Sequence, residues 1–185
     1  MYFFTSDEHY SHSNIIKYCN RPFNSIDEMN RAMTARHNEV VTDDDIVVHC
    51  GDFTMNREQH AKIIIRKLNG RHIFITGSHD KWIKNFNLDT AIGEKVLLVG
   101  SMWERKFDNV YLVACHYAMR KWPRSHYESI QVYGHSHGNL PPEGRQLDVG
   151  VDVHNFYPIS LDQVIQTINL NQGNTNGKAS PSSRV

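Results

Sequence analysis

The sequence predicts a layered α/β/β/α sandwich, in which two packed mixed sheets are flanked by helices. The first half of the chain alternates short apolar runs with amphipathic segments, a pattern that favours a parallel sheet covered by helices. The second half places several strand-like runs nearly in succession, and these predict a second sheet packed on the first. The chain has 185 residues, and residues 1–168 are expected to form a single domain.

The first predicted strand covers residues 1–6, which are apolar up to the acidic pair that follows. Ser13 is expected to cap a short helix over residues 14–18. Ser25-Ile26-Asp27-Glu28 is a capping box, in which the Ser and Glu side chains satisfy free amides at the start of a helix. A second helix is therefore predicted from this box to about Val40.

The remaining elements follow from periodicity and from turn residues. Helices are predicted over residues 57–69 and, after the capping box Ser160-Leu161-Asp162-Gln163, to about residue 168. Residues 169–185 are polar, rich in Asn, Gln, Gly and Ser, and are expected to form a disordered tail. Further strands are predicted over residues 46–50, 72–76, 95–99, 110–114, 130–133 and 146–151.

Composition narrows the possible environments and partners. Lys and Arg number 20 and are balanced by 20 Asp and Glu, so no overall positive charge favours nucleic acid or an anionic membrane. The apolar start lacks the basic region of a signal peptide, and nothing approaches the roughly 20 apolar residues of a membrane span. The three cysteines lack C-x-x-C spacing and are expected to be reduced thiols. A cytoplasmic location is expected, and no protein partner is implied.

Five strand-like runs each end in residues that can bind a metal, and the loops at such strand ends gather into one site. Two histidines two positions apart at a strand end project to the same side. For Gly134-His135-Ser136-His137 alone, a turn with two exposed histidines is an equally good interpretation, and the other runs decide against it. The candidate residues are Asp7 with His9, Asp52, His79, His116, and His135 with His137.

Mixed carboxylate and imidazole ligands favour a divalent transition metal, with Mn²⁺ expected first and Fe²⁺, Zn²⁺ or Ni²⁺ as alternatives. Seven candidate ligands exceed what one tetrahedral ion binds, so two ions are predicted, roughly 3.5–4 Å apart and bridged by a carboxylate and a water. Such a pair suits phosphoester hydrolysis, in which the leaving alkoxide needs a proton. His79, beside Asp80, which can orient it, is the candidate donor.

These blocks resemble those of the calcineurin-like metallophosphoesterases of the small single-domain bacterial and phage type. The resemblance covers residues 1 to about 168 and implies the four-layer fold of that family. It also implies that Asp7, His9 and His137 hold the first metal, that His116 and His135 hold the second, and that Asp52 bridges them. His79 would be the proton donor, with Asp80 as its partner. The family's D-x-H, G-D, G-N-H-D, lone H and G-H-x-H blocks correspond to Asp7-Glu8-His9, Gly51-Asp52, Gly77-Ser78-His79-Asp80, His116 and Gly134-His135-Ser136-His137.

One position departs from the family's pattern. Ser78 stands where the family has Asn, and its hydroxyl is shorter and a poorer metal ligand than a carboxamide oxygen. The second metal is therefore expected to bind weakly at Ser78, with water filling the place of the Asn. The contact that the family's Asn makes with the substrate phosphate is also in doubt.

Three residues are candidates for substrate binding. His12 follows His9 closely enough to reach a substrate, although an exposed histidine at a helix start is equally consistent with the sequence. Arg120 and Trp122 combine a cation with an aromatic plane, which suits a phosphate bearing a base, whereas a solvated basic loop is the alternative. Among other polar residues, Asp148 and Asp152 are expected to serve turns or to hydrogen-bond ligands, and His37, His49, His60 and His72 to be structural or exposed.

The leading hypothesis is an enzyme that hydrolyses phosphodiesters, or also phosphomonoesters, with two metal ions. About 168 structured residues leave no room for a lid domain, so a small or extended, nucleotide-like substrate is expected. A non-catalytic scaffold with the same fold is the alternative from another class, and Ser78 favours it mildly. A nuclease would need a basic track near the site, for which the neutral charge balance gives little support.

Overall fold

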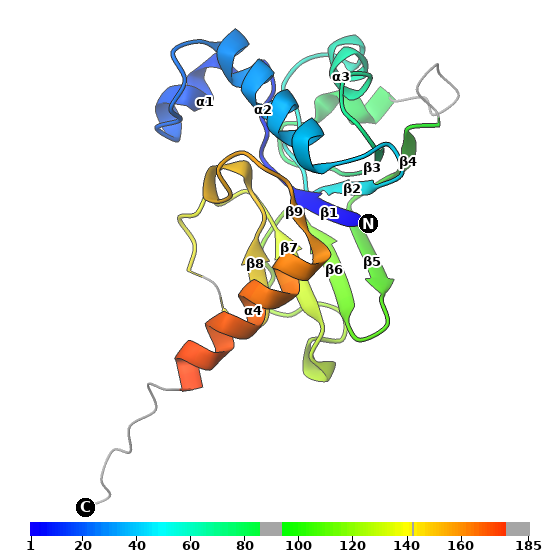
Figure 1. Ribbon diagram of the computed structural model, residues 1–185, viewed down its shortest axis with the longest axis vertical. Coiled ribbons are helices and arrows are strands. Elements are labelled where there is room, and N and C mark those ends of the chain that lie inside the picture. The colour runs from blue at the N-terminus through cyan, green and yellow to red at the C-terminus, as the bar shows by residue number, and fades with distance from the viewer. Residues whose placement is uncertain (86–93, 142, 177–185) are drawn as a thin grey trace, which may run out of the picture.

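The computed structural model describes residues 1–85, 94–141 and 143–176, and it contains two packed mixed β-sheets with flanking helices (Figure 1). The predicted fold class is confirmed. In the first sheet, β1 to β4 are parallel neighbours and β9 pairs antiparallel with β1. Its strands, in spatial order, are β4 (Val96–Gly100), β3 (Arg71–Ile75), β2 (Ile46–His49), β1 (Tyr2–Thr5) and β9 (Ile159–Ser160).

The second sheet packs below the first in the view of Figure 1. Here β6, β7 and β8 are parallel, and β5 lies antiparallel to β6 at the edge. The strands, in spatial order, are β5 (Met102–Lys106), β6 (Tyr111–Cys115), β7 (Ile130–Tyr133) and β8 (Gln146–Asp148).

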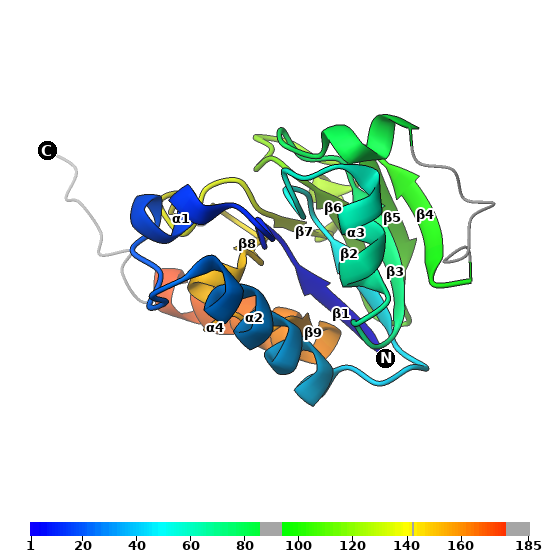
Figure 2. The ribbon, with the colours of Figure 1, turned by 90° about the horizontal axis from the view of Figure 1, so that it is seen from above.

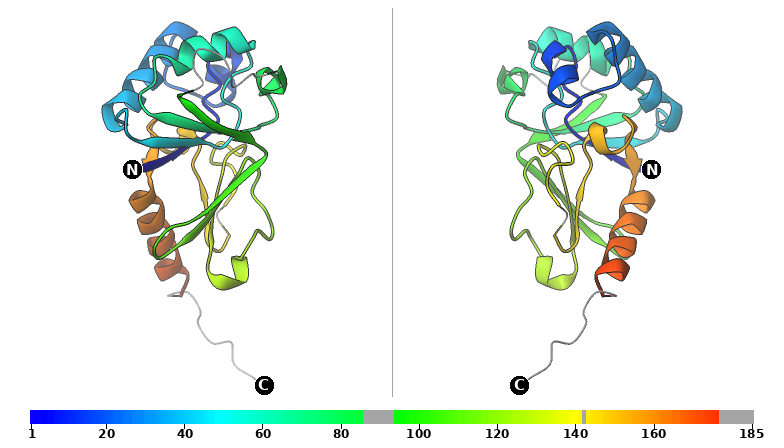
Figure 3. Two further views of the ribbon diagram at one scale, coloured as in Figure 1. Left: turned by 90° about the vertical axis from the view of Figure 1, so that its right-hand side faces the viewer. Right: turned by 90° about the vertical axis from the view of Figure 1, so that its left-hand side faces the viewer.

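Helices cover the first sheet on the side away from the second. Helices α1 (Ser13–Tyr18), α2 (Ile26–Val40) and α3 (Glu58–Ile65) lie together on that side, as Figures 2 and 3 show. Helix α4 (Leu161–Asn176) packs instead against β1, β8 and β9, along the side of the sandwich. Short 3-10 turns are found at Lys81–Asn85, Ser125–Tyr127 and Val151–Val153.

Alternate residues of the inner strands face two different cores, because side chains alternate across a strand. Ile73 and Ile75 of β3 face the second sheet and pack in one core with Leu112 and Val132. Phe74, between them, faces the helices and packs in the other core with Met29 and the neighbouring helical side chains. Both faces of β3 are therefore buried, as expected for a parallel strand inside a layered fold.

The capping box before α2 is confirmed. The Ser25 hydroxyl accepts a hydrogen bond from the Glu28 amide at 3.2 Å. The Glu28 carboxylate reaches one residue further than the motif predicts and accepts from the Asn24 amide at 2.8 Å. Ser25 therefore satisfies one free amide of the first helical turn, whereas Glu28 binds the amide of the residue before the N-cap and not that of Ser25 itself.

Several predicted boundaries were wrong. Ser13 is the first residue of α1, and the N-cap is His12, which makes no side-chain cap. Helix α4 continues to Asn176, past the expected end near residue 168, so residues 169–176 are helical and not disordered as predicted. Residues 177–185 lie outside the described part of the chain. Strand β5 was not predicted because it is an edge strand whose charged residues Glu104, Arg105 and Lys106 point largely to solvent.

Parallel pairing brings the candidate ligands together. Because the carboxyl ends of parallel strands meet at one edge of a sheet, the loops after β1, β2 and β3 emerge side by side. The loops after β6 and β7 emerge together from the second sheet in the same way. A bridge between Ser6 and Gly150 joins the β1 loop to the loop after β8. Residues far apart in the sequence thus meet at one end of the sandwich.

Candidate metal centre

Six of the predicted metal ligands form two groups in the structure. Asp7, His9 and His137 form the first, and Asp52, His116 and His135 form the second. Within each group, one ligand atom of every residue lies within 4.8 Å of those of the other two. The two groups match the division between a first and a second metal position that the sequence resemblance implied.

Asp52 lies between the two groups. Its Oδ2 atom is 3.7 Å from Nε2 of His9, which belongs to the first group, and 3.6 Å from Nε2 of His116, which belongs to the second. Nε2 of His79 is 3.9 Å from the same oxygen. One carboxylate oxygen therefore faces imidazole nitrogens of both groups, the arrangement that a bridging ligand requires.

Two of the histidines are oriented by their other ring nitrogen. His116 donates from Nδ1 to the carbonyl oxygen of Cys50 at 2.9 Å, and His137 donates from Nδ1 to Oδ2 of Asp152 at 2.7 Å. When the ring is neutral, a proton held on Nδ1 by these bonds leaves Nε2 free to bind a cation. Such partners fix the tautomer and the ring orientation of histidine ligands in metalloproteins.

Unpaired buried atoms show that these residues fit a metal. Among the described residues, Oδ1 of Asp7, both ring nitrogens of His9, and Nε2 of His116 are buried without a hydrogen-bond partner. An unsatisfied buried polar atom costs about 1–3 kcal/mol, and a cation bound by these atoms would satisfy them. Oxygen and imidazole nitrogen together suit a divalent transition metal.

Burial also changes the proton affinity of the ligands. It raises the pKa of Asp7 well above its ordinary value, although the nearby His137 and the amide of His135 act in the opposite direction. It lowers the pKa of His9 to about 3, so this imidazole is neutral near pH 7. Neutral imidazole is the form that binds metals.

The backbone is left-handed at most of the ligands. This conformation costs an L-residue of order 1–3 kcal/mol and is concentrated at functional sites. The sequence analysis expected His135 and His137 to project to the same side of a strand end. This expectation was wrong, because β7 ends at Tyr133 and both histidines have a left-handed backbone. Positive φ angles occur at Asp7 (58°), His9 (50°), Asp52 (56°), His135 (69°) and His137 (48°).

Two glycines allow the ligand loops to touch. A Cβ atom on Gly134 would lie 1.9 Å from the Ser6 hydroxyl and 2.5 Å from Oδ2 of Asp7. A Cβ atom on Gly77 would lie 2.2 Å from the amide nitrogen of Asp52. Both contacts are too short for any larger residue, so the glycines of the third and fifth sequence blocks are required by close packing.

Comparison with known proteins places the chain in a family. No protein-family model matches it. The uncharacterized protein MJ1445 of Methanocaldococcus jannaschii is 33% identical over 172 residues, which are 88% of this chain and 88% of that protein. The chain belongs to the MJ1445 family.

A solved structure shares the fold of this chain. The AQ665 protein of unknown function from Aquifex aeolicus has a TM-score of 0.68 and 20% identity, over 91% of this chain and 99% of that one. An archaeal phosphodiesterase has a TM-score of 0.42 and 18% identity, over 80% and 81% of the two chains. The AQ665 match supports the two-sheet fold, and the five sequence blocks lie at one end of this sandwich.

Ser78 of this MJ1445-family chain lies beside Asp52. Its hydroxyl donates a hydrogen bond to Oδ2 of Asp52 at 3.0 Å, and the amide of His79 donates to Oδ1 at 2.8 Å. The residue that stands in place of the Asn of the calcineurin-like block therefore holds the carboxylate that faces both groups.

His79 and His12 lie on the open side of the centre. The His79 side chain is 43% exposed, and its ring centroid is 5.4 Å from that of His9. The His12 ring is 5.4 Å from His9 and 6.4 Å from His79. Both rings therefore lie beside His9 of the first group.

Asp80 has a different place from the one expected. It is buried, and its two oxygens accept hydrogen bonds from the Asp52 amide at 2.7 Å and from further donors, so it folds the Asp52 loop. Among the described residues, no hydrogen bond joins it to the His79 ring. The further donors are the amides of Phe53, Thr54 and Gly77 and the indole of Trp82.

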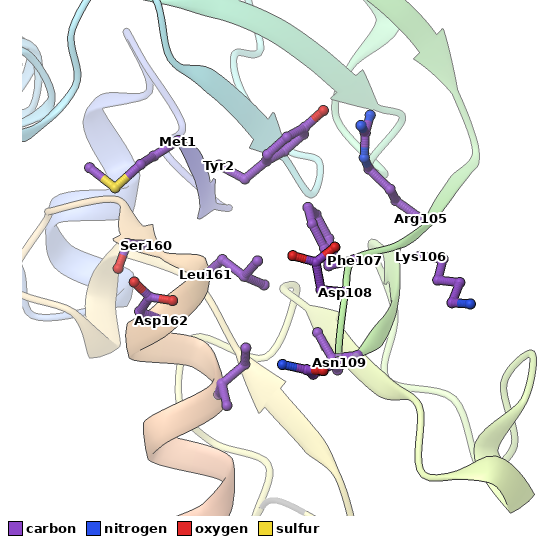
Figure 4. Close-up of a pocket in the computed structure, with 12 residues that line it drawn as sticks. Met1, Tyr2, Arg105, Lys106, Phe107, Asp108, Asn109, Ser160, Leu161 and Asp162 are labelled. Atoms are coloured by element: carbon purple, nitrogen blue, oxygen red, sulfur yellow. The ribbon is translucent and has the colours of Figure 1, made fainter.

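Arg120 and Trp122 line a cavity of about 280 Å³ that contains none of the six grouped ligands. The Trp122 indole donates to the carbonyl of Ser129, which precedes β7, whereas His135 follows that strand. A larger cavity of about 450 Å³, lined by Tyr2, Arg105 and Phe107 among others, lies at the start of β1 (Figure 4). Neither cavity belongs to the ligand groups.

Two polar residues complete the surroundings of the ligands. Asp148 accepts from the Ser136 hydroxyl at 2.7 Å and from the Gly138 amide at 3.0 Å, and so shapes the turn that carries His135 and His137, as the sequence predicted. Arg21 is buried beside the first group, and the sequence analysis missed it. No local pattern distinguishes it from a surface arginine in a loop.

No helix in the described part of the chain has the length and apolar character needed to cross a membrane.

Proposed function

We propose that this protein is a phosphoesterase that uses two divalent transition-metal ions. The observation that carries the proposal is the position of Asp52, whose Oδ2 atom faces the Nε2 atoms of His9 and His116 at 3.7 and 3.6 Å. Asp7, His9 and His137 would hold the first ion, and His116 and His135 the second, with Asp52 shared. Bound there, the ions supply Lewis-acid polarisation of the phosphoryl group and a water of lowered pKa.

The residues of the chain then have distinct tasks. Hydrogen bonds fix the positions of three of these side chains: His116 bonds to the Cys50 carbonyl, His137 bonds to Asp152, and Asp7 accepts from the amide of His135. His79 is not a ligand in either group. It lies at the exposed edge, where its ring is positioned to donate a proton to the leaving oxygen as the P–O bond breaks.

The substrate class follows from the open side of the site. His135 is exposed and the His79 side chain is 43% exposed, so the centre is open to solvent at these two residues. This favours a small or extended phosphodiester, with nucleotide-like compounds first, and allows phosphomonoesters. Mn²⁺ is the first metal to test, followed by Fe²⁺, Zn²⁺ and Ni²⁺.

Hydrolysis assays distinguish this enzyme from a non-catalytic scaffold. Metal-stripped protein is supplied with Mn²⁺ and assayed with bis(p-nitrophenyl) phosphate and p-nitrophenyl phosphate, beside an Asp7→Asn variant and a chelator control. We expect Mn²⁺-dependent release of p-nitrophenol by the wild type that falls at least tenfold in Asp7→Asn. Equal release by both proteins, or none with any of the four metals, favours the scaffold.

A further inference from the structure

We infer that Arg21 is a positioning residue. Its single guanidinium fixes the relative positions of the three residues proposed to hold the first metal ion, Asp7, His9 and His137. The inference rests on the proposed function, because it concerns the same centre. Arg21 lies in the loop between α1 and α2, outside the five sequence blocks. Its side chain is fully buried, although arginine is normally exposed.

The guanidinium binds Asp152 through two parallel hydrogen bonds. Nε of Arg21 donates to Oδ1 of Asp152 at 2.8 Å, and Nη2 donates to Oδ2 at 2.8 Å. Such a bidentate pair is geometrically specific, because the planar fork of arginine matches the two carboxylate oxygens. The negative charge of Asp152 offsets part of the positive charge of the buried arginine.

Asp152, fixed by Arg21, in turn orients the ring of His137. Its Oδ2 atom accepts the Nδ1 proton of His137 at 2.7 Å, which leaves Nε2 of that ring for the metal. This hydrogen bond fixes both the tautomer and the plane of the ring.

The other donors of Arg21 bind the loop that carries the remaining two ligands. Nη2 donates to the carbonyl oxygen of Asp7 at 2.7 Å, and Nη1 donates to the carbonyl oxygen of Glu8 at 2.9 Å. These carbonyls lie between the left-handed residues Asp7 and His9, where the backbone conformation is costly. Arg21 thus stabilises the strained turn and orients His137 at the same time.

Lysine cannot replace this arrangement, because an ammonium is a point charge and lacks the planar fork. A further group of potential ligands, Cys19, His137 and Asp152, also lies within 4.8 Å. Both oxygens of Asp152 are already bonded to Arg21 and His137, so this group serves the first metal position and does not form another one.

The test measures Mn²⁺ binding by calorimetry to metal-stripped wild type, Arg21→Lys and Asp152→Asn. Arg36→Lys is the matched control, because Arg36 packs on the same Phe156 ring as Arg21, at 5.4 Å against 5.6 Å. A His135→Ala variant shows which of the two measured affinities belongs to the second metal position. His135→Ala should reduce that affinity and leave the other unchanged. Circular dichroism melting shows whether each variant is folded. If Arg21→Lys does not fold, Asp152→Asn still tests the inference, because it removes the charge of Asp152 and keeps the shape of the side chain.

We expect Arg21→Lys and Asp152→Asn to lose about 10- to 100-fold in affinity for the first ion, while the second affinity changes less than twofold. Arg36→Lys should bind both ions as the wild type does. Folded variants with unchanged affinities, or with equal losses at both positions, would overturn the inference. If the wild type binds two ions without cleaving any ester, the proposed function fails while the affinity comparison still tests Arg21; if it binds none, both fail.

Discussion

The imidazole of His116 faces Asp52 with its Nε2 atom 3.6 Å from the carboxylate Oδ2 atom. The same oxygen is 3.7 Å from Nε2 of His9, on the other side of the centre. His116 and His9 come from different sheets, after β6 and β1. The Asp52 carboxylate is therefore the point at which the two halves of the sandwich contribute to one site.

Replacing Asp52 by Asn should weaken both metal positions. The neutral amide keeps the size of the side chain but removes the charge that both groups share. We expect at least a hundredfold loss of Mn²⁺-dependent hydrolysis, about 2.7 kcal/mol in activation free energy, and lower Mn²⁺ affinity at both positions. Asp44→Asn, which neutralises an exposed carboxylate, is the matched control. Loss of one affinity alone would show that Asp52 is not shared.

Replacing Ser78 by Asn should improve the second position. The carboxamide oxygen reaches further than the hydroxyl, which now hydrogen-bonds to Asp52 at 3.0 Å. We expect higher turnover and a higher Mn²⁺ content per chain after dialysis against limiting metal, measured by elemental analysis. Ser78→Ala, which removes the hydroxyl without adding a ligand, should show neither gain. If Ser78→Asn leaves turnover and metal content unchanged, Ser78 is not a defect of the centre.

Replacing His79 by Ala should affect substrates according to their leaving group. A proton donor matters when the departing alkoxide is a strong base, and much less when it is p-nitrophenolate. We expect kcat for alkyl phosphodiesters to fall about 10²–10⁴-fold, and kcat for p-nitrophenyl esters to fall far less. His126→Ala, a histidine at the separate cavity that Trp122 lines, is the control. Equal losses for both substrate types would assign His79 a binding role.

A buried histidine outside the centre should make stability depend on pH. Burial lowers the pKa of His37 to about 4, against its ordinary value of 6.5, while its bond to the Asn69 carbonyl raises it only partly. The unfolded chain therefore binds a proton that the folded chain does not, so stability is complete above pH 6.5 and falls as the pH drops toward 4. The loss amounts to about 3 kcal/mol by linkage.

Chemical denaturation of metal-free wild type and His37→Gln between pH 7.5 and 4 measures this effect. The wild type should lose more stability over this range than the variant, because glutamine does not titrate. Parallel curves would show that His37 is protonated in the folded protein too.

Much of the fold and of the site follows from local sequence signals. The capping box at Ser25 fixes the start of α2, and the apolar runs fix most strands, because both depend on neighbouring residues alone. The proximity of the candidate ligands was predictable, since each follows a strand and parallel pairing brings the strand ends together.

The features that were missed depend on tertiary contacts. Arg21 acquires its role from Asp152, 131 residues away. Asp80 folds the Asp52 loop by accepting amide hydrogen bonds, which no spacing in the sequence reveals. The polar end of α4 is helical although its composition suggests disorder, and Gln172 there accepts a hydrogen bond from Arg145 at 2.9 Å.

Electron paramagnetic resonance of the protein loaded with two equivalents of Mn²⁺ tests the central claim most directly. Two ions that share Asp52 are close enough for their spins to couple, so we predict the spectrum of a coupled Mn²⁺ pair, which Asp52→Asn should convert to that of separate ions. Two uncoupled ions in the wild type, or a single bound ion at saturation, would contradict the account.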